Sequence, residues 1–218
     1  MEFDFSLITN SLPLLLQGAL VTLEITAMAV GLGLVFGLLA ALAQLSKFTP
    51  LRLLAKIYVD FIRGTPLLVQ ISSSTLRFPQ LSDSGIDVRG RCGRLLDQFG
   101  RYVAEIFRSG ISPSREPVEA GRSLGFNYAQ TMWYIIMPQA FKTVLPTLCN
   151  EFISLLKETS VAGYIAIQDL TKGGDIIRSR TYSAFMPLIA VALIYLIIVM
   201  IFTKLIQILE RRLRQNER

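Results

Sequence analysis

Two carboxylates lie in an otherwise apolar stretch of the second half of the chain. Glu151 and Glu158 are seven residues apart, about two turns of an α-helix, so a helix would place both on one face with Ser154 between them. A charge at bilayer depth costs about 2.5–3.5 kcal/mol on insertion scales and usually lines a cavity or faces a partner. Such a face could receive the ammonium group of an amino acid. The alternative is structural: Glu158 bonds Arg63 or Lys157, or lies at the outer interface.

A second group of polar residues surrounds Pro66. Proline has no amide hydrogen, so in a helix the carbonyl of Ile62 would lose its partner. With Gly64 beside it, the sequence predicts a kink that offers polar backbone to a translocation path. Thr65 and Gln70 are the side chains expected to line that path. Ordinary packing of a kinked helix explains the same residues equally well.

The composition excludes several other kinds of chemistry. The 218 residues include no histidine, which removes the usual general base and the commonest metal ligand. Cys92 and Cys149 form neither a disulfide framework nor a metal-ligand pattern. No glycine-rich Walker-type sequence is present, so ATP and Mg²⁺ are expected on a partner subunit. We expect no catalytic residue, metal or cofactor on this chain, and no nucleic-acid partner.

Two apolar runs must position these polar groups. Residues 25–46 and 184–203 are 22 and 20 residues long and contain no charged side chain. About 20 helical residues cross the hydrocarbon core of a bilayer, so each run can span it. Within the first run, Gly33 and Gly37 are spaced so that a neighbouring helix can approach closely. The sequence therefore predicts an all-α membrane protein.

The distribution of charge predicts the orientation. Residues 1–11 carry only acidic charges, whereas Lys47, Arg52 and Lys56 follow the first apolar run and residues 210–218 are net basic. Because basic loops tend to stay in the cytoplasm, we expect the N-terminus outside, the C-terminus inside and an odd number of crossings. Five spans are expected, with three as the fallback. The weaker spans are sought in residues 51–71, in a helix ending at residues 102–107, and in residues 143–167.

The segment 118–138 is too polar to span a membrane. It predicts a short helix, a break at Gly125, a cap at Asn127, and a second short helix that Pro138 stops. Such an amphipathic helix can lie in the groove of a partner and transmit a rigid-body movement. An interfacial connector without a partner is the alternative. Its basic neighbours place the segment on the cytoplasmic side: Arg108, Arg115 and Lys142.

This segment resembles the EAA loop of permease subunits of binding-protein-dependent ABC importers. The loop has Glu-Ala-Ala, three residues, Gly, nine residues, Ile, one residue and Leu-Pro. Here Gly121 replaces the second alanine and Met137 replaces the leucine. Residues 61–70 and 145–160 are similar to signatures of the polar amino-acid (histidine/glutamine) permeases. The residues that stand at the pattern's positions are Glu119, Ala120, Gly121, Gly125, Ile135 and Pro138.

The resemblance implies a type I ABC importer permease fold. It implies one transmembrane domain over residues 1–218, with five spans and a cytoplasmic coupling loop at 116–138, in a bacterial inner membrane. The implied partners are a separate ATPase, a periplasmic or lipid-anchored binding protein, and a second permease copy or paralogue. The implied substrate is glutamine or another polar or basic amino acid. A membrane scaffold without a translocation path and a secondary transporter are the rival interpretations.

Residues 72–100 depart from this family, which has apolar helix here. The segment contains Arg89, Arg91 and Arg94, which would destabilise a helix facing lipid. One interpretation is a reading-frame slip, because codons for Phe-Phe-Ile-Tyr-Phe read one base later give the Ser-Ser-Ser-Thr of residues 72–75. The alternative is true divergence into a soluble loop. A clean reading frame on resequencing would exclude the slip.

Overall fold

The computed structural model of the protein describes residues 5–46, 48–70, 99–109, 115–165 and 167–215, and every regular element in them is helical. The all-α prediction is confirmed. Residues 67–70 and 99–109 are also helical. The other elements, in order, are α1 (Phe5–Leu45), α2 (Thr49–Gly64), α5 (Arg115–Ser123), α6 (Tyr128–Thr131), the π-helical turn η2 (Met132–Ile136), α7 (Met137–Glu158), the 3₁₀ segment η3 (Thr159–Ile165), α8 (Leu170–Thr181) and α9 (Phe185–Gln215).

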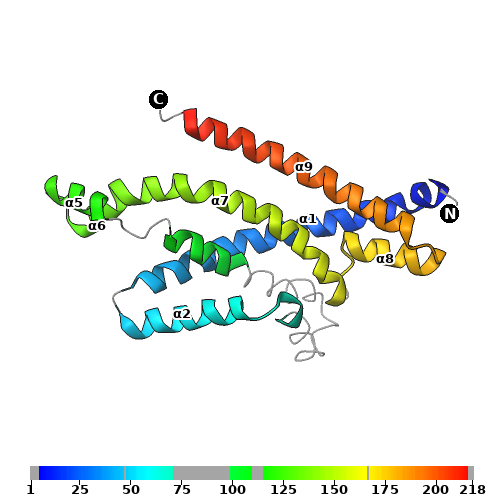
Figure 1. The fold of residues 1–218 in the computed structure, drawn as a ribbon, viewed down its shortest axis with the longest axis horizontal. Coiled ribbons are helices and arrows are strands. Elements are labelled where there is room, and N and C mark those ends of the chain that lie inside the picture. Colours follow the sequence, from blue (N-terminus) through cyan, green and yellow to red (C-terminus); the bar gives the residue numbers. More distant parts are fainter. Residues whose placement is uncertain (1–4, 47, 71–98, 110–114, 166, 216–218) are drawn as a thin grey trace.

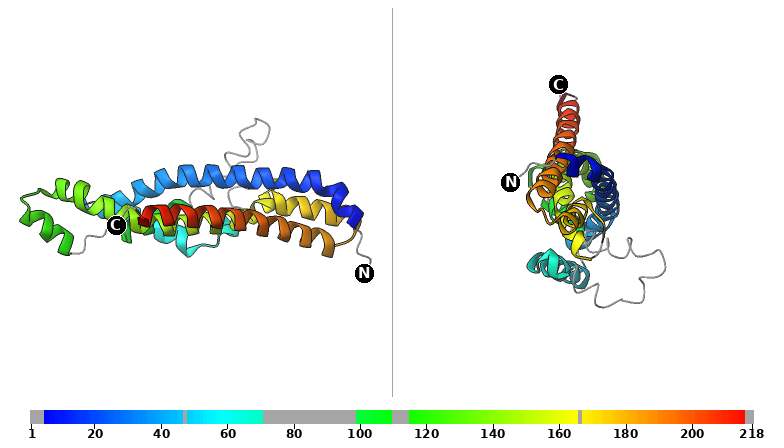
Figure 2. Two further views of the ribbon diagram at one scale, coloured as in Figure 1. Left: turned by 90° about the horizontal axis from the view of Figure 1, so that it is seen from above. Right: turned by 90° about the vertical axis from the view of Figure 1, so that its right-hand side faces the viewer.

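The helices form an elongated bundle (Figure 1). The three long helices α1, α7 and α9 contact one another, and α1 also contacts α2 and α8. The short helices α5 and α6 lie at one end of the long axis, whereas α8 and the start of α1 lie at the other, as Figure 1 and the left view of Figure 2 show. The two ends of the bundle therefore carry different elements.

Two helices are long and apolar enough to cross a membrane, within α1 (Thr9–Leu45) and α9 (Phe185–Arg212). Both present large apolar side chains on their outer surfaces, such as Phe36 on α1 and Ile201 on α9. A water-soluble protein rarely exposes apolar stripes of this size, whereas lipid covers them without cost. The two predicted apolar spans are thus helices with lipid-compatible surfaces. The count of five spans stays a prediction.

The predicted close approach at the glycine step of α1 is present. A side chain at Gly37 would place its Cβ 2.5 Å from the carbonyl oxygen of Gly100 and 2.5 Å from Val103 Cβ. At Gly33 the Cβ would lie 3.2 Å from the amide nitrogen of Gly100. Gly31, by contrast, has open space beside it. The helix 99–109 therefore packs on the Gly33–Gly37 step of α1 with backbone almost against backbone.

The anomalous segment 72–100 lies outside the described residues, except for Phe99 and Gly100, which are buried against α1. The next residue, Arg101, is only 5% exposed. Its guanidinium lies 3.8 Å from the centroid of the Tyr102 ring, and its Nε has no hydrogen-bond partner in the part of the chain that the structure describes. A buried, incompletely satisfied arginine is costly in an apolar helix interface.

Candidate functional site

The segment between α5 and α7 folds largely as its residues predict. Gly125 ends the first helix with a φ of +77°, which favours glycine because it has no Cβ. Asn127 then caps α6: its side chain accepts a hydrogen bond from the Gln130 amide at 2.9 Å, and the Gln130 side chain accepts one from the Asn127 amide at 2.9 Å. This reciprocal capping box fixes the angle at which the chain re-enters the helix.

The expectation that Pro138 stops the second helix is wrong. The chain continues from α6 through the π-helical turn η2 directly into α7, and Pro138 occupies the first turn of α7. Proline has no amide hydrogen to donate to the helix. The hydrogen bonding at this point is already altered by the wider π turn, because the Met137 amide donates to the carbonyl of Met132, five residues back. α6 and α7 are therefore continuous, and a push on α6 reaches α7 directly.

Gly121 is explained by the side chain that faces it. A methyl at this position would lie 2.5 Å from Cγ2 of Thr131, which is 2% exposed and whose hydroxyl donates to the Asn127 carbonyl at 3.0 Å. The contact joins α5 to the end of α6. Thr131 therefore takes the space that the alanine of the usual EAA pattern would fill.

Gly121→Ala should lower the stability of the protein by about 1–3 kcal/mol, the usual cost of overpacking. Adding Thr131→Ala should recover part of that loss, because it removes Cγ2 and the hydroxyl while Cβ stays close. The apparent melting temperatures of the purified variants measure both effects. Thr131→Ala alone is the control. Equal melting temperatures for Gly121→Ala and the unchanged protein would contradict the contact.

The outer surface of this segment is unusually apolar. Leu124 is 68% exposed, Trp133 69% and Tyr134 72%, and Tyr128 is also exposed. Glu119, Ala120 and Pro138 are exposed as well, whereas Ile135 is half-buried. Tyr128 and Trp133 line a cavity that faces α1, whereas Leu124 and Tyr134 do not. We call residues 115–138, which begin with α5 and contain the coupling loop predicted at 116–138, the coupling segment.

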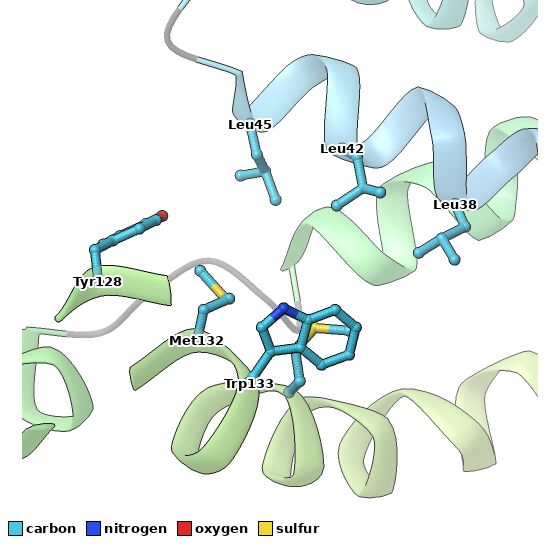
Figure 3. Close-up of a pocket in the computed structure, with 7 residues that line it drawn as sticks. Leu38, Leu42, Leu45, Tyr128, Met132 and Trp133 are labelled. Atoms are coloured by element: carbon cyan, nitrogen blue, oxygen red, sulfur yellow. The ribbon is translucent and has the colours of Figure 1, made fainter. Parts of the chain in front are cut away.

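An apolar cavity of about 440 Å³ separates the coupling segment from the end of α1 (Figure 3). In the figure, Leu38, Leu42 and Leu45 point from α1 toward Met132 and Trp133 of the segment. The facing side chains leave room for the segment to shift against α1.

The predicted polar face of α7 has a helical backbone from Glu151 to Glu158. Glu151, Ser154 and Glu158 are all half-buried, so each has both protein and open space around it. The buried Arg101 acts electrostatically on Glu151. The geometry is compatible with a substrate path along this face, and that role stays a prediction.

The helix is interrupted at Thr65 and Pro66 and resumes at Leu67. α2 ends at Gly64, and Thr65 is extended with φ −117° and ψ 137°. The side-chain amide of Gln70 donates from Nε2 to the Ile62 carbonyl at 3.0 Å and to the Thr65 carbonyl at 3.0 Å. The Thr65 hydroxyl donates to the Phe61 carbonyl at 3.0 Å. Both side chains thus donate hydrogen bonds to backbone carbonyls around the interruption of the helix. Their role in a pathway stays a prediction.

Arg63 of α2 pairs with Glu105 at 2.9 Å.

A buried polar cluster at the other end of the bundle was not predicted. Asp169 is 0% exposed and accepts hydrogen bonds from the amides of Lys172 at 3.0 Å and Thr171 at 3.2 Å, so it caps α8. The Leu170 amide donates to Thr22 of α1 at 3.1 Å. Burial raises the pKa of the Asp169 carboxyl, and these hydrogen bonds offset part of the rise. An aspartate directly before a helix is the sequence signal for this cap.

Within the described ranges, no three His, Cys, Asp or Glu side chains form a group that could hold a metal ion.

The chain is similar over its full length to known transport proteins. Residues 33–215 match the family model described as binding-protein-dependent transport system inner membrane component. The arginine transport system permease protein ArtQ of Bacillus subtilis is 33% identical over 100% of both chains. The glutamine transport system permease protein GlnP of Escherichia coli K12 is 34% identical over 98% of this chain and 99% of that protein.

Two solved structures of ABC transporters contain chains whose fold matches that of this protein. The crystal structure of an amino acid ABC transporter with histidines contains a chain that is 40% identical, with a TM-score of 0.90 over 97% of this chain and 100% of that one. An inward-facing structure of the MetNI methionine ABC transporter has a chain with a TM-score of 0.77 at 17% identity, covering 92% of this chain and 96% of that one. At this identity the second match concerns the fold alone.

Proposed function

Since the chain belongs to the family of inner membrane components of binding-protein-dependent transport systems, we propose that it is the permease subunit of an ABC importer for a polar or basic amino acid. The relatives named for arginine and glutamine transport, and the related transporter structure with histidines, support this substrate class. The proposal rests on one structural feature of this chain. The exposed coupling segment continues without interruption into α7, which bears the polar face.

The coupling segment is the surface proposed for the ATPase. Its exposed residues Glu119 and Ala120, together with the exposed side chains of Leu124 and Tyr134, suit a groove on a partner that hydrolyses ATP. Closure of two ATPases would push α6, and α7 would move with it because the two helices are continuous. The permease would work as a pair of copies or with a paralogue.

The substrate path is proposed along Glu151, Ser154 and Thr65, with Glu158 and Gln70 beside it. A carboxylate can receive the α-ammonium group that every amino acid carries, and a helix break adds polar backbone to the path. The proposed orientation places the coupling segment in the cytoplasm and the N-terminus outside. Substrate then arrives from a binding protein on the outer side.

Glu151→Gln should lower uptake by about 10- to 100-fold, because a hydrogen bond to a charged group is worth about 1.5–3 kcal/mol. The measurement is ATP-driven uptake of radiolabelled arginine, glutamine and histidine into proteoliposomes that contain the whole complex. Lys157→Gln is the matched control, since Lys157 lies on the same helix and is exposed. Its uptake should stay within about twofold of that of the unchanged protein.

The same experiment separates the rival functions. A scaffold without a translocation path would keep its uptake after Glu151→Gln, because substrate would pass through another subunit. A secondary transporter would take up substrate without ATP and without a partner ATPase. Uptake that is strictly ATP-dependent and lost in Glu151→Gln would support the permease alone.

A further inference from the structure

The cavity between α1 and the coupling segment has the size and lining of a ligand pocket. Its volume of about 440 Å³ falls within the roughly 300–1,000 Å³ of pockets that hold small molecules. Three leucines of α1 face Met132 and Trp133 across it, as Figure 3 shows: Leu38, Leu42 and Leu45. None of the side chains that line it carries a charge. The cavity therefore suits an apolar ligand and not a free amino acid.

The cavity lies at the level of the membrane surface. The uncharged run of residues 25–46 is 22 residues long, about the number that crosses the hydrocarbon core, and Leu45 stands at its end. On the opposite wall, Tyr128 and Trp133 are of the two residue types that are enriched where acyl chains meet headgroups. This level follows from the length of the run, whichever side of the membrane the coupling segment faces.

The lining of the cavity continues the lipid-facing surface of α1. Leu42 and Leu45 are exposed, and so is Leu39, which does not line the cavity. Leu39 and Leu42 are three residues apart and are therefore neighbours on the helix surface. Because lipid covers the exposed leucines of a spanning helix, an acyl chain can reach the cavity along the same surface.

Basic side chains stand at the same end of α1. The helix α2 begins where α1 ends (Figure 1), and Arg52 lies in its first turn, with its amide donating to the Phe48 carbonyl at 3.1 Å. Lys56 follows four residues later, so both lie on one face of α2. Both are exposed, and neither pairs with a carboxylate in the part of the chain that the structure describes. Basic groups beside an apolar pocket at the membrane surface are typical of sites for anionic lipid headgroups.

We infer that the cavity binds one acyl chain of an anionic phospholipid, whose headgroup lies beside Arg52 and Lys56. The acyl chain would bury apolar surface against the leucines of α1 and against Trp133, which stabilises the bound lipid. The negative phosphate would face the guanidinium and ammonium groups at the start of α2. A phospholipid without net charge would make the apolar contacts but gain less from these two groups. The inference concerns this chain alone and does not depend on the proposed function.

Trp133 provides a direct test, because it is the single tryptophan of the chain and lines the cavity. The purified full-length protein, in a mild detergent, is titrated with phosphatidylglycerol that carries bromine atoms on its acyl chains. Bromine quenches tryptophan fluorescence on contact. We expect quenching that saturates, and a concentration for half of it that is at least about fivefold lower than for brominated phosphatidylcholine, since basic residues near the surface favour anionic lipid.

Two substitutions separate the apolar contact from the charge. Leu42→Gln puts a polar amide into the lining and should raise the half-quenching concentration about tenfold. Leu39→Gln is the matched control, an exposed leucine of the same helix outside the cavity, and should change it by less than about twofold. Arg52→Gln should raise the value about fivefold for phosphatidylglycerol and leave it unchanged for phosphatidylcholine. Size-exclusion chromatography shows whether each variant is folded.

Each contrary result would overturn the inference. Quenching that rises without saturation and equally for the two lipids would mean contact with bulk lipid only. Equal effects of Leu42→Gln and Leu39→Gln would place the acyl chain outside the cavity. No quenching at all would mean that detergent or a segment of the protein fills it. Saturable quenching that Arg52→Gln leaves unchanged would show that the headgroup does not lie beside Arg52. These measurements involve neither ATP nor uptake, so their failure leaves the proposed function intact, and a failure of the proposed function leaves them valid.

Discussion

Replacing Ala120 by arginine is expected to abolish ATP-driven uptake while the protein still inserts into the membrane. Ala120 is exposed on α5, next to the exposed Glu119, so the long charged side chain meets no other part of this chain. At the proposed interface it would have to be buried without a partner, which is strongly unfavourable. We expect the ATPase to be lost from the purified complex and uptake to fall at least about 100-fold, which corresponds to about 2.8 kcal/mol.

Ala120→Ser is the matched control for this variant. It changes the same position by one hydroxyl, and its uptake should stay within about threefold of that of the unchanged protein. Co-purification of the ATPase with a tagged permease measures docking, and size-exclusion chromatography in detergent measures folding. An Ala120→Arg complex that retains its ATPase and its uptake would show that α5 is not the docking helix.

The sequence predicted the coupling segment well because its structure is determined locally. Gly125 and Asn127 act within a few residues of their own positions, and both have the roles that the pattern indicated. Pro138 was misread because its effect depends on the π turn before it, which has no recognisable sequence signature. The fit of Gly121 to Thr131 also escaped prediction, because it depends on how α5 folds back on α6.

Longer-range relations were harder to predict. Gln70 satisfies a carbonyl eight residues earlier, and no hydrophobic periodicity indicates such a bond. The residue pattern placed Glu151, Ser154 and Glu158 on one face, but it could not show that the buried Arg101 acts on Glu151. The burial of Asp169 was not predicted, since it depends on residues distant in the sequence such as Gly18 of α1. The glycine step on α1 was the exception, because close helix packing needs little more than small residues at that spacing.

Gly37→Leu, at the Gly33–Gly37 step of α1, is the second substitution for which we expect a large effect. The new Cβ would lie 2.5 Å from the Gly100 carbonyl oxygen, which belongs to the backbone and cannot rotate away. The helix 99–109 would have to separate from α1, and the buried contacts of Phe99 and Val103 would be lost with it. The cost should exceed the 1–3 kcal/mol that overpacking usually brings, because backbone atoms are involved. A loss of this size is a large part of the stability of a typical protein.

Gly31→Leu separates this clash from the general effect of replacing a glycine in α1. Gly31 lies in the same helix, is exposed and has nothing within 4 Å of an added Cβ, so both variants gain the same helix propensity. We expect the yield of monodisperse protein to fall at least about tenfold for Gly37→Leu and to stay unchanged for Gly31→Leu. Val103→Ala should restore part of the yield of Gly37→Leu, since it removes the Cγ1 that would lie 2.6 Å from the new Cβ. Equal yields for the two leucine variants would mean that the helix 99–109 does not pack on the Gly33–Gly37 step.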